Sequence, residues 1–414
     1  MSLRVLMLTQ WYDPEGGAAG HPGVVARALR DLGHEVHVVT GVPIYPLGKV
    51  FPEYRNRLYQ RELIDGVTVH RGPIFPSHDA RASRRMATYL SFALSGILTT
   101  LRGARGVDVV YVYSSPATTA LPALVLGPFR RWPVVLHIQD LWPDSVTASG
   151  FVASTRAGLV ERLLHRFCAL TYRRSTTVAV SAPGMIDILE ERGVPADKLR
   201  LVPNWADEEH FGPRPRSQSL AAELGLQAPT VVMYAGNFGE LQDLGTVVDA
   251  AALLRDRDDI LVALVGSGVA EARLKAAVTD RGLTNVRFVP PQPFEEIATV
   301  LALADAQLVT LKDVPLLRST LPSKLQANLA AGHPVIGAVR GDAASVIADS
   351  GSGIVVPPGD ARALADAIAR FAELPLEARA EMGRTARSTY EHRFSRATVS
   401  AMLDRVLREA VADG

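Results

Sequence analysis

The sequence predicts an α/β protein in which two doubly wound domains follow one another. Short runs of β-branched and apolar residues recur along the 414 residues, and a helical pattern follows each of them. Continuous apolar strands that alternate with helices are typical of a parallel sheet covered on both faces. The pattern restarts near the middle of the chain, and the length suits two or three domains.

In the first half, we expect a strand at Arg4–Thr9, then a glycine-rich loop and a helix from about Pro22 to Leu32. Gly33 follows this helix, at the position where a positive φ costs least. Further strands are expected at Glu35–Thr40, Asp108–Tyr113, Pro133–His137 and Thr177–Ser181.

In the second half, the expected strands are Thr230–Gly236, Ile260–Val265, Val286–Val289, Ala306–Thr310, Pro334–Gly337 and Gly353–Val356. Phe211–Ser219 is rich in Pro, Gly, Ser and Arg and has no periodicity, which indicates the weak point between the two halves. The segment from Phe394 onward has helical spacing, with Ser395 as its N-cap.

The composition excludes several classes of protein. There are 44 Lys and Arg against 43 Asp and Glu, a balance unlike that of a nucleic-acid binder. Cys168 is the one cysteine, so an internal disulfide and a cysteine-rich metal site are both excluded, and it reads as a buried thiol. The chain also lacks a His-x-x-x-His or His-Glu-x-x-His motif, so no metal site is predicted.

A helical run without charges, Met86–Leu101, is the strongest candidate for membrane contact. It falls short of the roughly 20 residues that a span needs, and arginines flank it on both sides. We expect an amphipathic helix that faces a cleft or the core, and the alternative is a helix lying in a membrane interface. The N-terminus lacks the features of a signal peptide. The predicted location is therefore cytoplasmic, with at most peripheral contact at the inner face of the membrane.

Glycine turns follow three of the expected strands. Ligands of doubly wound domains bind outside the carboxyl ends of the strands, which here means the cleft between the halves, and glycine lets a backbone approach a phosphate. The candidate binding residues are Gly16 and Gly17 in the first half, and Gly236, Asn237, Gly239, Gln242, Gly266 and Gly268 in the second. Plain strand-to-helix turns are the alternative.

A helix start at Pro322-Ser323-Lys324 is the second candidate phosphate site. Ser323 reads as an N-cap or first helical residue, so helix amides, a hydroxyl and the Lys324 ammonium would act on one anion. Arg318 lies six residues before Lys324 and is a further candidate cation. The alternative is a capped helix without a ligand.

A third candidate site follows the strand that ends at His137. Asp140, Trp142 and Asp144 lie in the loop after it and suit acid–base or acceptor contacts. His137 and Asp140 are the candidate catalytic residues, although a histidine on an apolar strand is often a core residue.

Several segments resemble those of one enzyme family: Gly33–Val36, Tyr234–Asn237, Ala330–Val335 and Gly353–Asp360. Through them the chain resembles the retaining glycosyltransferases of family 4, whose fold is named GT-B. Further segments resemble the branch that builds capsule, O-antigen and colanic acid: Tyr45–Val50, Leu58–Glu62, Asp140–Asp144 and Pro322–Lys324.

The resemblance implies two facing Rossmann-like domains, with the last helix returning to the first domain. The expected N-terminal domain is residues 1–205 with 394–414, and residues 206–393 form the nucleotide-sugar domain. The implied donor is a nucleotide-diphosphate sugar, with a UDP- or GDP-sugar expected, and no separate cofactor or metal. A retaining mechanism lets the acceptor attack from the face that the diphosphate leaves, so no strong protein nucleophile is needed.

The chain departs from the family at its charged positions. Ser319 and Ala327 stand where the family has a Glu-x7-Glu pair. Asn237 and Gln242 replace the usual Arg and Lys, and Gln139, beside Asp140, replaces the usual His. The leaving diphosphate still requires compensating charge. We therefore expect Lys324 and Arg318 to supply it.

The function expected is a glycosyltransferase with a nucleotide-diphosphate sugar as donor. Its acceptor is either a polyprenyl-linked glycan or a small molecule such as a natural product or thiol. Two alternatives stay open. One is a GT-B-fold epimerase that hydrolyses a nucleotide sugar, and the other is a catalytically dead protein that binds sugar nucleotides, as the missing glutamates would allow.

Overall fold

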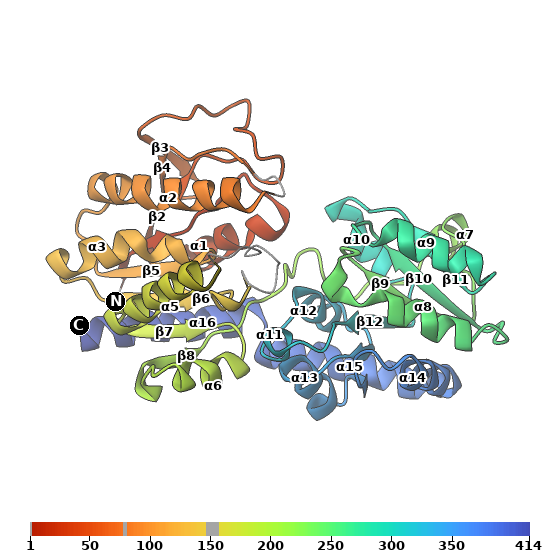
Figure 1. Cartoon of the computed structure of the whole chain (residues 1–414). Helices are drawn as coiled ribbons and strands as arrows, with labels where there is room; N and C mark the ends of the chain where they lie inside the picture. Colours follow the sequence, from red (N-terminus) through yellow and green to blue (C-terminus); the bar gives the residue numbers. More distant parts are fainter. Residues whose placement is uncertain (1, 78–80, 146–156) are drawn as a thin grey trace. The chain divides into compact units, whose positions relative to one another are not determined.

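The computed structural model describes residues 2–77, 81–145 and 157–414, and the chain divides into two compact units. The N-terminal unit comprises Met1–Pro203 with Ser400–Gly414, and the C-terminal unit comprises Asn204–Val399. Each unit is a largely parallel sheet with helices on its faces (Figure 1). The predicted α/β architecture with two doubly wound sheets is confirmed.

The sheet of the N-terminal unit has eight strands within its described residues, in the order β3-β4-β2-β1-β5-β6-β7-β8. All neighbours are parallel except β3 and β4. The strands are β1 (Arg4–Leu8), β2 (Glu35–Gly41), β3 (Gln60–Ile64), β4 (Val67–Gly72), β5 (Val109–Ser114), β6 (Val134–Ile138), β7 (Thr177–Val180) and β8 (Leu199–Leu201). Every residue of β5 is buried, as expected for a central strand covered on both faces.

The antiparallel pair β3–β4 was not among the expected strands. Asp65 and Gly66 join the two strands, with φ of 47° and 75°. An Asp-Gly pair with positive φ at both residues is typical of the tight turns that connect hairpins. The exposed residues that alternate along β3 explain why no apolar run marks it in the sequence.

Helices cover both faces of this sheet: α1 (His21–Asp31), α2 (Ala82–Gly103), α3 (Leu121–Arg130), α5 (Ala157–Arg174), α6 (Gly184–Glu191) and α16 (Arg396–Asp413). The expected helix Met86–Leu101 lies inside α2. Among the described helices, none combines the length and the hydropathy that a membrane span requires.

The sheet of the C-terminal unit, all of whose residues are described, has six parallel strands in the order β11-β10-β9-β12-β13-β14. They are β9 (Thr230–Ala235), β10 (Ile260–Val265), β11 (Val286–Val289), β12 (Ala306–Thr310), β13 (Val335–Ala338) and β14 (Gly353–Val356). The helices are α7 (Gln218–Glu223), α8 (Leu244–Leu253), α9 (Glu271–Asp280), α10 (Phe294–Leu301), α11 (Pro315–Arg318), α12 (Ser323–Ala330), α13 (Asp342–Ser350), α14 (Ala361–Glu373) and α15 (Leu376–Arg393).

The segment expected to be the weak point between the halves lies inside the C-terminal unit, so that expectation was wrong. Phe211 packs edge-on against Phe294, with ring centroids 5.9 Å apart. Arg216 pairs with Asp305 at 3.3 Å. The irregular segment is therefore held against the second sheet, and the boundary between the units falls at residues 203/204.

The last helix, α16, begins in the C-terminal unit and ends in the N-terminal unit. The Ser395 hydroxyl accepts from the Thr398 amide at 3.2 Å, which confirms the expected N-cap. Leu403 and Val406 are buried. Asp404 accepts a hydrogen bond from His34 Nε2 at 2.8 Å and so fastens the helix to the N-terminal unit.

The strand order reverses between β1 and β5 in one sheet and between β9 and β12 in the other. Loops that leave the carboxyl ends of two such strands run in opposite directions and leave room for a ligand. The candidate residues that follow these strands therefore stand where doubly wound sheets bind their ligands.

Candidate functional site

Two glycine turns follow neighbouring strands of the C-terminal unit. Gly236 follows β9 and Gly266 follows β10, with φ of 140° and 133°, which L side chains rarely adopt. The Gly236 amide donates to Val265 O at 2.9 Å, and the Phe238 amide donates to Ser267 O at 2.7 Å. A Cβ on Gly266 would collide with the carbonyl oxygen of Gly236. The two turns thus form one surface, and their contact requires glycine.

The Lys324 ammonium lies against the first of these turns. Its Nζ is 3.6 Å from the centroid of the Tyr234 ring and 3.2 Å from the place of a Cβ on Gly236. This nitrogen is buried, and it has no hydrogen-bond partner among the described residues. Burial lowers the pKa of the Lys324 ammonium from 10.5 to about 7, whereas the ring face favours the charged form. A buried cation with only a ring beside it is suited to meet an anion.

The start of α12 carries this lysine. The N-cap is Pro322, so Ser323 is the first helical residue. Its side chain is exposed. The first amides of a helix have no partner within it, and the helix dipole is positive at this end. The amides of α12 and the ammonium of Lys324 can therefore act on the same anion.

Asn237 and Gln242 pack over Gly239. A Cβ on Gly239 would lie 2.8 Å from Asn237 Nδ2 and would collide with Gln242 Oε1. The Thr310 hydroxyl donates to the Gln242 carbonyl at 2.6 Å and ties this turn to the end of β12. The oxygen of Asn237 lies against the place of a Cβ on Gly268. Both side chains are uncharged, so they bring no positive charge to these turns.

Arg318 forms an ion pair with a carboxylate. Its Nε donates to Asp313 Oδ1 at 2.8 Å, and Arg340 approaches the other oxygen of Asp313 at 3.5 Å. The side chain is about half exposed, at 49%. The structure therefore pairs Arg318 with Asp313, a carboxylate that Arg340 shares.

In the N-terminal unit, polar side chains gather at the carboxyl ends of β5 and β6. Asp140 follows β6, and the Ser115 hydroxyl donates to its Oδ2 at 2.9 Å. The Tyr113 hydroxyl lies 3.2 Å from His21 Nδ1, at the start of α1. Desolvation raises the pKa of Asp140, the Ser115 hydroxyl opposes this rise, and solvent at the exposed carboxylate limits it. Asp140 is therefore placed to accept a hydrogen bond from a ligand hydroxyl. His21 and Tyr113 lie at the same end of the sheet but were not among the site residues predicted from the sequence.

His137 is a core residue, so the catalytic role expected for it is corrected. Its Nε2 donates to Val202 O at 2.8 Å, and its Nδ1 accepts from the Tyr111 hydroxyl at 2.7 Å. Burial lowers the pKa of His137 to about 3, which keeps the ring neutral. Both ring nitrogens are used inside the sheet, so neither can exchange a proton with a substrate.

A buried carboxylate, which the sequence analysis did not single out, fixes the first glycine loop. Gly16 and Gly17 are exposed, and Gly17 has a φ of 62°. Glu15 is buried and accepts from the amides of Tyr12 at 3.0 Å, Ile44 at 2.7 Å and Tyr45 at 2.8 Å. Glu15 thus joins the loop after β1 to the loop after β2 and leaves the two glycines facing solvent.

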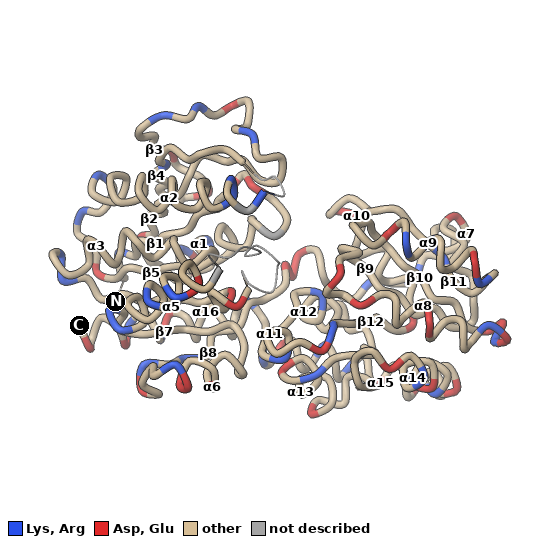
Figure 2. Tube along the Cα trace, in the orientation of Figure 1, with Lys and Arg blue, Asp and Glu red and all other residues tan. Residues whose placement is uncertain are grey.

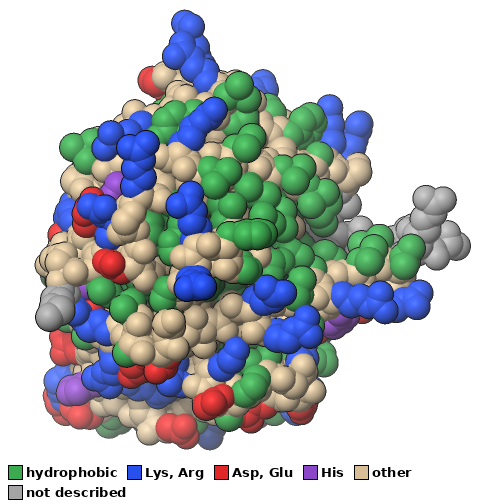
Figure 3. All heavy atoms as spheres, turned by 90° about the vertical axis from the view of Figure 1, so that its left-hand side faces the viewer, with side chains coloured by type: hydrophobic (Ala, Val, Ile, Leu, Met, Phe, Trp, Pro, Cys, Tyr) green, Lys and Arg blue, Asp and Glu red, His purple; other side chains and the backbone are tan. Residues whose placement is uncertain are grey.

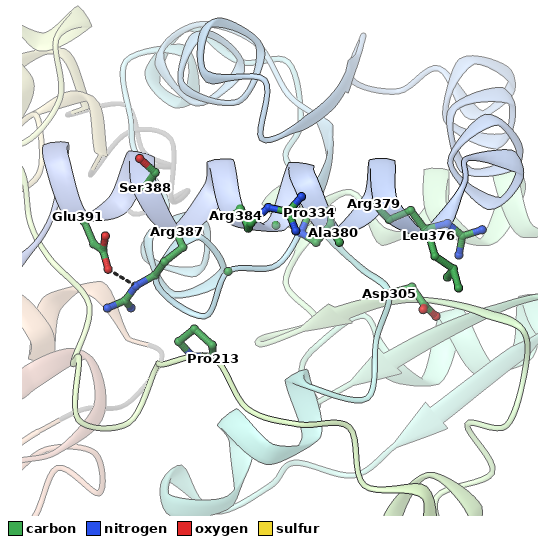
Figure 4. Close-up of a pocket in the computed structure, with 12 residues that line it drawn as sticks. Pro213, Asp305, Pro334, Leu376, Arg379, Ala380, Arg384, Arg387, Ser388 and Glu391 are labelled. Carbon is green, nitrogen blue, oxygen red and sulfur yellow. Dashed lines mark hydrogen bonds and ion pairs between the residues drawn. The ribbon is translucent and has the colours of Figure 1, made fainter.

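A cavity of about 610 Å³ lies against α15, on the other edge of the C-terminal sheet (Figure 4). Asp305 and Pro334 in its wall precede β12 and β13, so the cavity lies at the amino ends of the strands. Two of its arginines are paired with carboxylates, Arg384 with Glu381 at 2.6 Å and Arg387 with Glu391 at 2.7 Å. We therefore do not assign the ligand site to this cavity.

Cys168 is buried, as expected, and burial raises the pKa of its thiol to about 11. A thiol held protonated at neutral pH is a poor nucleophile. In the part of the chain that the structure describes, no group of three or more His, Cys, Asp or Glu residues is arranged to hold a metal ion.

Comparison with known families assigns both units. Residues 16–205 match the family model described as "Glycosyl transferase 4-like domain", and residues 218–389 match the one described as "Glycosyl transferases group 1". The colanic acid biosynthesis glycosyl transferase WcaI of Escherichia coli (strain K12) is 30% identical over 335 residues, which cover 80% of this chain and 82% of that protein.

Solved structures share the fold across the whole chain. Sucrose-phosphate synthase from Thermosynechococcus elongatus superposes with a TM-score of 0.74 at 21% identity and covers 100% of both chains. Anabaena Alr3699/HepE in complex with UDP and glucose has a TM-score of 0.69 at 18% identity and covers 98% of this chain and 99% of that one. These likenesses show the architecture.

Proposed function

Because the chain belongs to the GT-B-fold glycosyltransferases of group 1 and family 4, we propose that Lys324 and the glycine turns after β9 and β10 hold the diphosphate of its sugar nucleotide. The observation that carries this proposal is the buried ammonium that stands 3.6 Å from the Tyr234 ring and has no hydrogen-bond partner among the described residues. Leaving a buried charge without a polar partner costs free energy. A bound diphosphate would supply that partner.

The same ammonium answers the main chemical demand of the reaction. As the glycosidic bond breaks, negative charge develops on the leaving diphosphate, and preorganised donors stabilise it. Lys324 and the first amides of α12 are fixed by packing before the donor arrives. We infer a metal-independent reaction, because this ammonium offers the positive charge that the leaving group requires.

A retaining transfer is supported by the resemblance and by the side chains of the N-terminal unit. Asp140 with Ser115 suits the binding of an acceptor hydroxyl. In a retaining transfer the acceptor attacks from the face that the diphosphate leaves, so the leaving oxygen can take the acceptor proton. No covalent intermediate with a protein side chain is then needed.

The donor that we propose is a UDP-sugar, with a GDP-sugar as the alternative. The solved structure with UDP and glucose is a protein of the same fold, and this likeness supports UDP. The proposed acceptor is a glycan, since the similar Escherichia coli protein is named for colanic acid biosynthesis. A small-molecule acceptor is the second candidate.

One observation favours a different function, a protein that binds sugar nucleotides without turnover. Ser319 and Ala327 provide no carboxylate where the family has its glutamate pair, and Ser319 is buried with its hydroxyl directed to Leu316 O at 3.3 Å. An epimerase has no comparable support. Turnover assays with donor alone and with donor plus acceptor separate the three functions, because an epimerase needs no acceptor and the binding protein releases no diphosphate.

The decisive experiment uses Lys324→Ala. Thermal shifts with UDP, GDP, ADP and dTDP first identify the nucleotide that the folded protein binds. Loss of one preorganised donor to the developing charge should then lower kcat by about 10²–10³-fold. Asn237→Arg in the same chain, which restores a cation beside the turn, should recover part of that rate. Full activity of Lys324→Ala would remove this lysine from the site.

A further inference from the structure

Four helices of the N-terminal unit lie on one face of its sheet. The connections from β4 through α2 to β5, from β5 through α3 to β6, from β6 through α5 to β7 and from β7 through α6 to β8 all run in the same direction along the strand order. Connections between parallel strands are right-handed, so helices on connections of one direction cover one face. Figure 1 shows α2, α3 and α5 stacked in this order.

Large apolar side chains are concentrated on the outer side of these helices. Among the described residues, nineteen large hydrophobic side chains are exposed, and nine of them belong to α2, α3 and α5. On α2, Leu90, Leu94, Leu98 and Leu101 are 44–62% exposed and follow a spacing of four, four and three, so they form one stripe. Phe92 and Thr99 lie on the buried side of the same helix.

Exposed apolar side chains also stand on the other two helices. Phe129 at the end of α3 is 86% exposed, and α2 packs directly on α3. Leu159, Val160 and Leu163 of α5 are also exposed. Figure 3 shows hydrophobic side chains gathered on the N-terminal unit, with Lys and Arg along the margin. An apolar area spread over three elements is what a binding surface requires.

The charge of α2, α3 and α5 is strongly one-sided, whereas α6, at the edge of the sheet, carries the exposed acids Asp187, Glu190 and Glu191. The three helices contain eight arginines, no lysine and one acidic residue, Glu161, although the whole chain has a net charge of only +1. Arg102 and Arg130 end α2 and α3, and Arg162 and Arg166 stand beside Leu163 on α5; all four are exposed. Figure 2 shows how few acidic residues these helices carry compared with those of the C-terminal unit.

We propose that this face, defined as the outer side of α2, α3 and α5, docks on a membrane that contains anionic lipid. Leucines at the stripe would enter the boundary between headgroups and acyl chains, and the arginines would meet the phosphates. A second copy of the chain fits less well, because pairing the face with itself would bring like charges together. The sequence left open whether Met86–Leu101 faces a core or a membrane interface, and the exposed stripe favours the membrane.

The test is flotation of the full-length protein with vesicles of phosphatidylcholine containing 30% phosphatidylglycerol, and with vesicles of phosphatidylcholine alone. No nucleotide sugar is added, so the result does not depend on the proposed transfer reaction. We expect binding to the anionic vesicles that weakens as salt rises, because salt screens the arginines. Equal binding to both vesicles, or no binding to either, would overturn the proposal.

Matched variants locate the surface. Leu94→Glu with Leu98→Glu should lower vesicle binding at least about tenfold, because two charges then stand where side chains enter the lipid. Leu253→Glu with Leu376→Glu places the same charges on exposed leucines of the C-terminal unit and should leave binding unchanged. Equal loss in both variants would show that net charge, and not this face, decides binding.

The arginines and the oligomeric state complete the test. Arg162→Gln with Arg166→Gln should weaken binding to anionic vesicles about 25-fold, at roughly fivefold for each basic residue near the surface. Sedimentation without lipid shows whether the wild type forms a dimer that Leu94→Glu with Leu98→Glu dissociates. Such a dimer, together with absence of vesicle binding, would assign the face to a second copy and refute the membrane proposal.

Discussion

The buried ammonium of Lys324 should make donor binding take up a proton. With a pKa of about 7, the side chain is about three-quarters deprotonated at pH 7.5 in the free protein. A diphosphate beside Nζ favours the charged form and raises this pKa. We therefore expect uptake of about 0.7 proton per sugar nucleotide at pH 7.5, and of about 0.1 proton at pH 6, where the lysine is already charged.

Isothermal titration calorimetry measures this uptake. The observed enthalpy changes with the ionisation enthalpy of the buffer in proportion to the number of protons bound. A sugar nucleotide is the right ligand, because its diphosphate is esterified at both ends and does not titrate near pH 7. Lys324→Met should abolish the dependence on the buffer. An equal proton uptake by wild type and Lys324→Met would refute the assignment of the proton to this lysine.

The same pKa predicts the stability of the variant. A lysine whose pKa falls from 10.5 to about 7 on folding costs up to roughly 5 kcal/mol below pH 7. Lys324→Met should therefore raise the free energy of unfolding at pH 6.5, by up to about 5 kcal/mol. This gain should shrink between pH 7 and pH 10.5, because the folded lysine is then neutral and removing the proton from the unfolded lysine costs less as the pH rises. Thermal melts across this pH range check the sign, and a lower Tm for Lys324→Met would contradict it.

Four further variants test separate parts of the structure. Gly266→Ala should lose nucleotide binding while the unit stays folded by circular dichroism, because its Cβ would displace the Gly236 turn; unchanged affinity would contradict the joined turns. Arg318→Ala should keep kcat within about twofold in a steady-state assay, since its guanidinium is paired with Asp313 and half exposed, and a large loss would restore it to the site. His137→Gln should lower Tm but leave kcat nearly intact at a temperature where the variant is folded, and selective loss of kcat would indicate catalysis. Asp404→Ala should lower the Tm of the N-terminal unit, by an amount that corresponds to about 1 kcal/mol, because the His34 bond to α16 is lost.

The parts of the fold that the sequence predicted are those with strong local signals. β10, β11, β12 and β14 begin and end at the expected residues, because β-branched apolar runs marked them. The hairpin β3–β4 was missed, since β3 is half exposed and carries polar residues. The irregular segment 211–219 was placed between the units, although long-range contacts such as Arg216 with Asp305 bind it to the second sheet.

Some features of the candidate site could likewise be predicted from the sequence, and others could not. The two glycine turns could be predicted, because positive φ leaves few residue types besides glycine. The partner of Lys324 could not, because Tyr234 lies ninety residues earlier and only the fold brings its ring to the ammonium. His137 was ambiguous for a similar reason, since the Val202 carbonyl that accepts from it is remote in the sequence. Arg318 is close to Lys324 along the chain, but the ion pair that it makes with Asp313 could not be predicted from their spacing.

The division of the chain also fixes an order of synthesis. The C-terminal unit is one continuous segment, whereas the N-terminal unit is completed by residues 400–414. On the ribosome, the first 203 residues emerge early. Their unit stays incomplete until the last turns of α16, with Asp404, have been made. The continuous second unit needs no residue beyond Val399 to close. Folding should therefore finish with the domain that was begun first, although domains usually mature in order from the N-terminus.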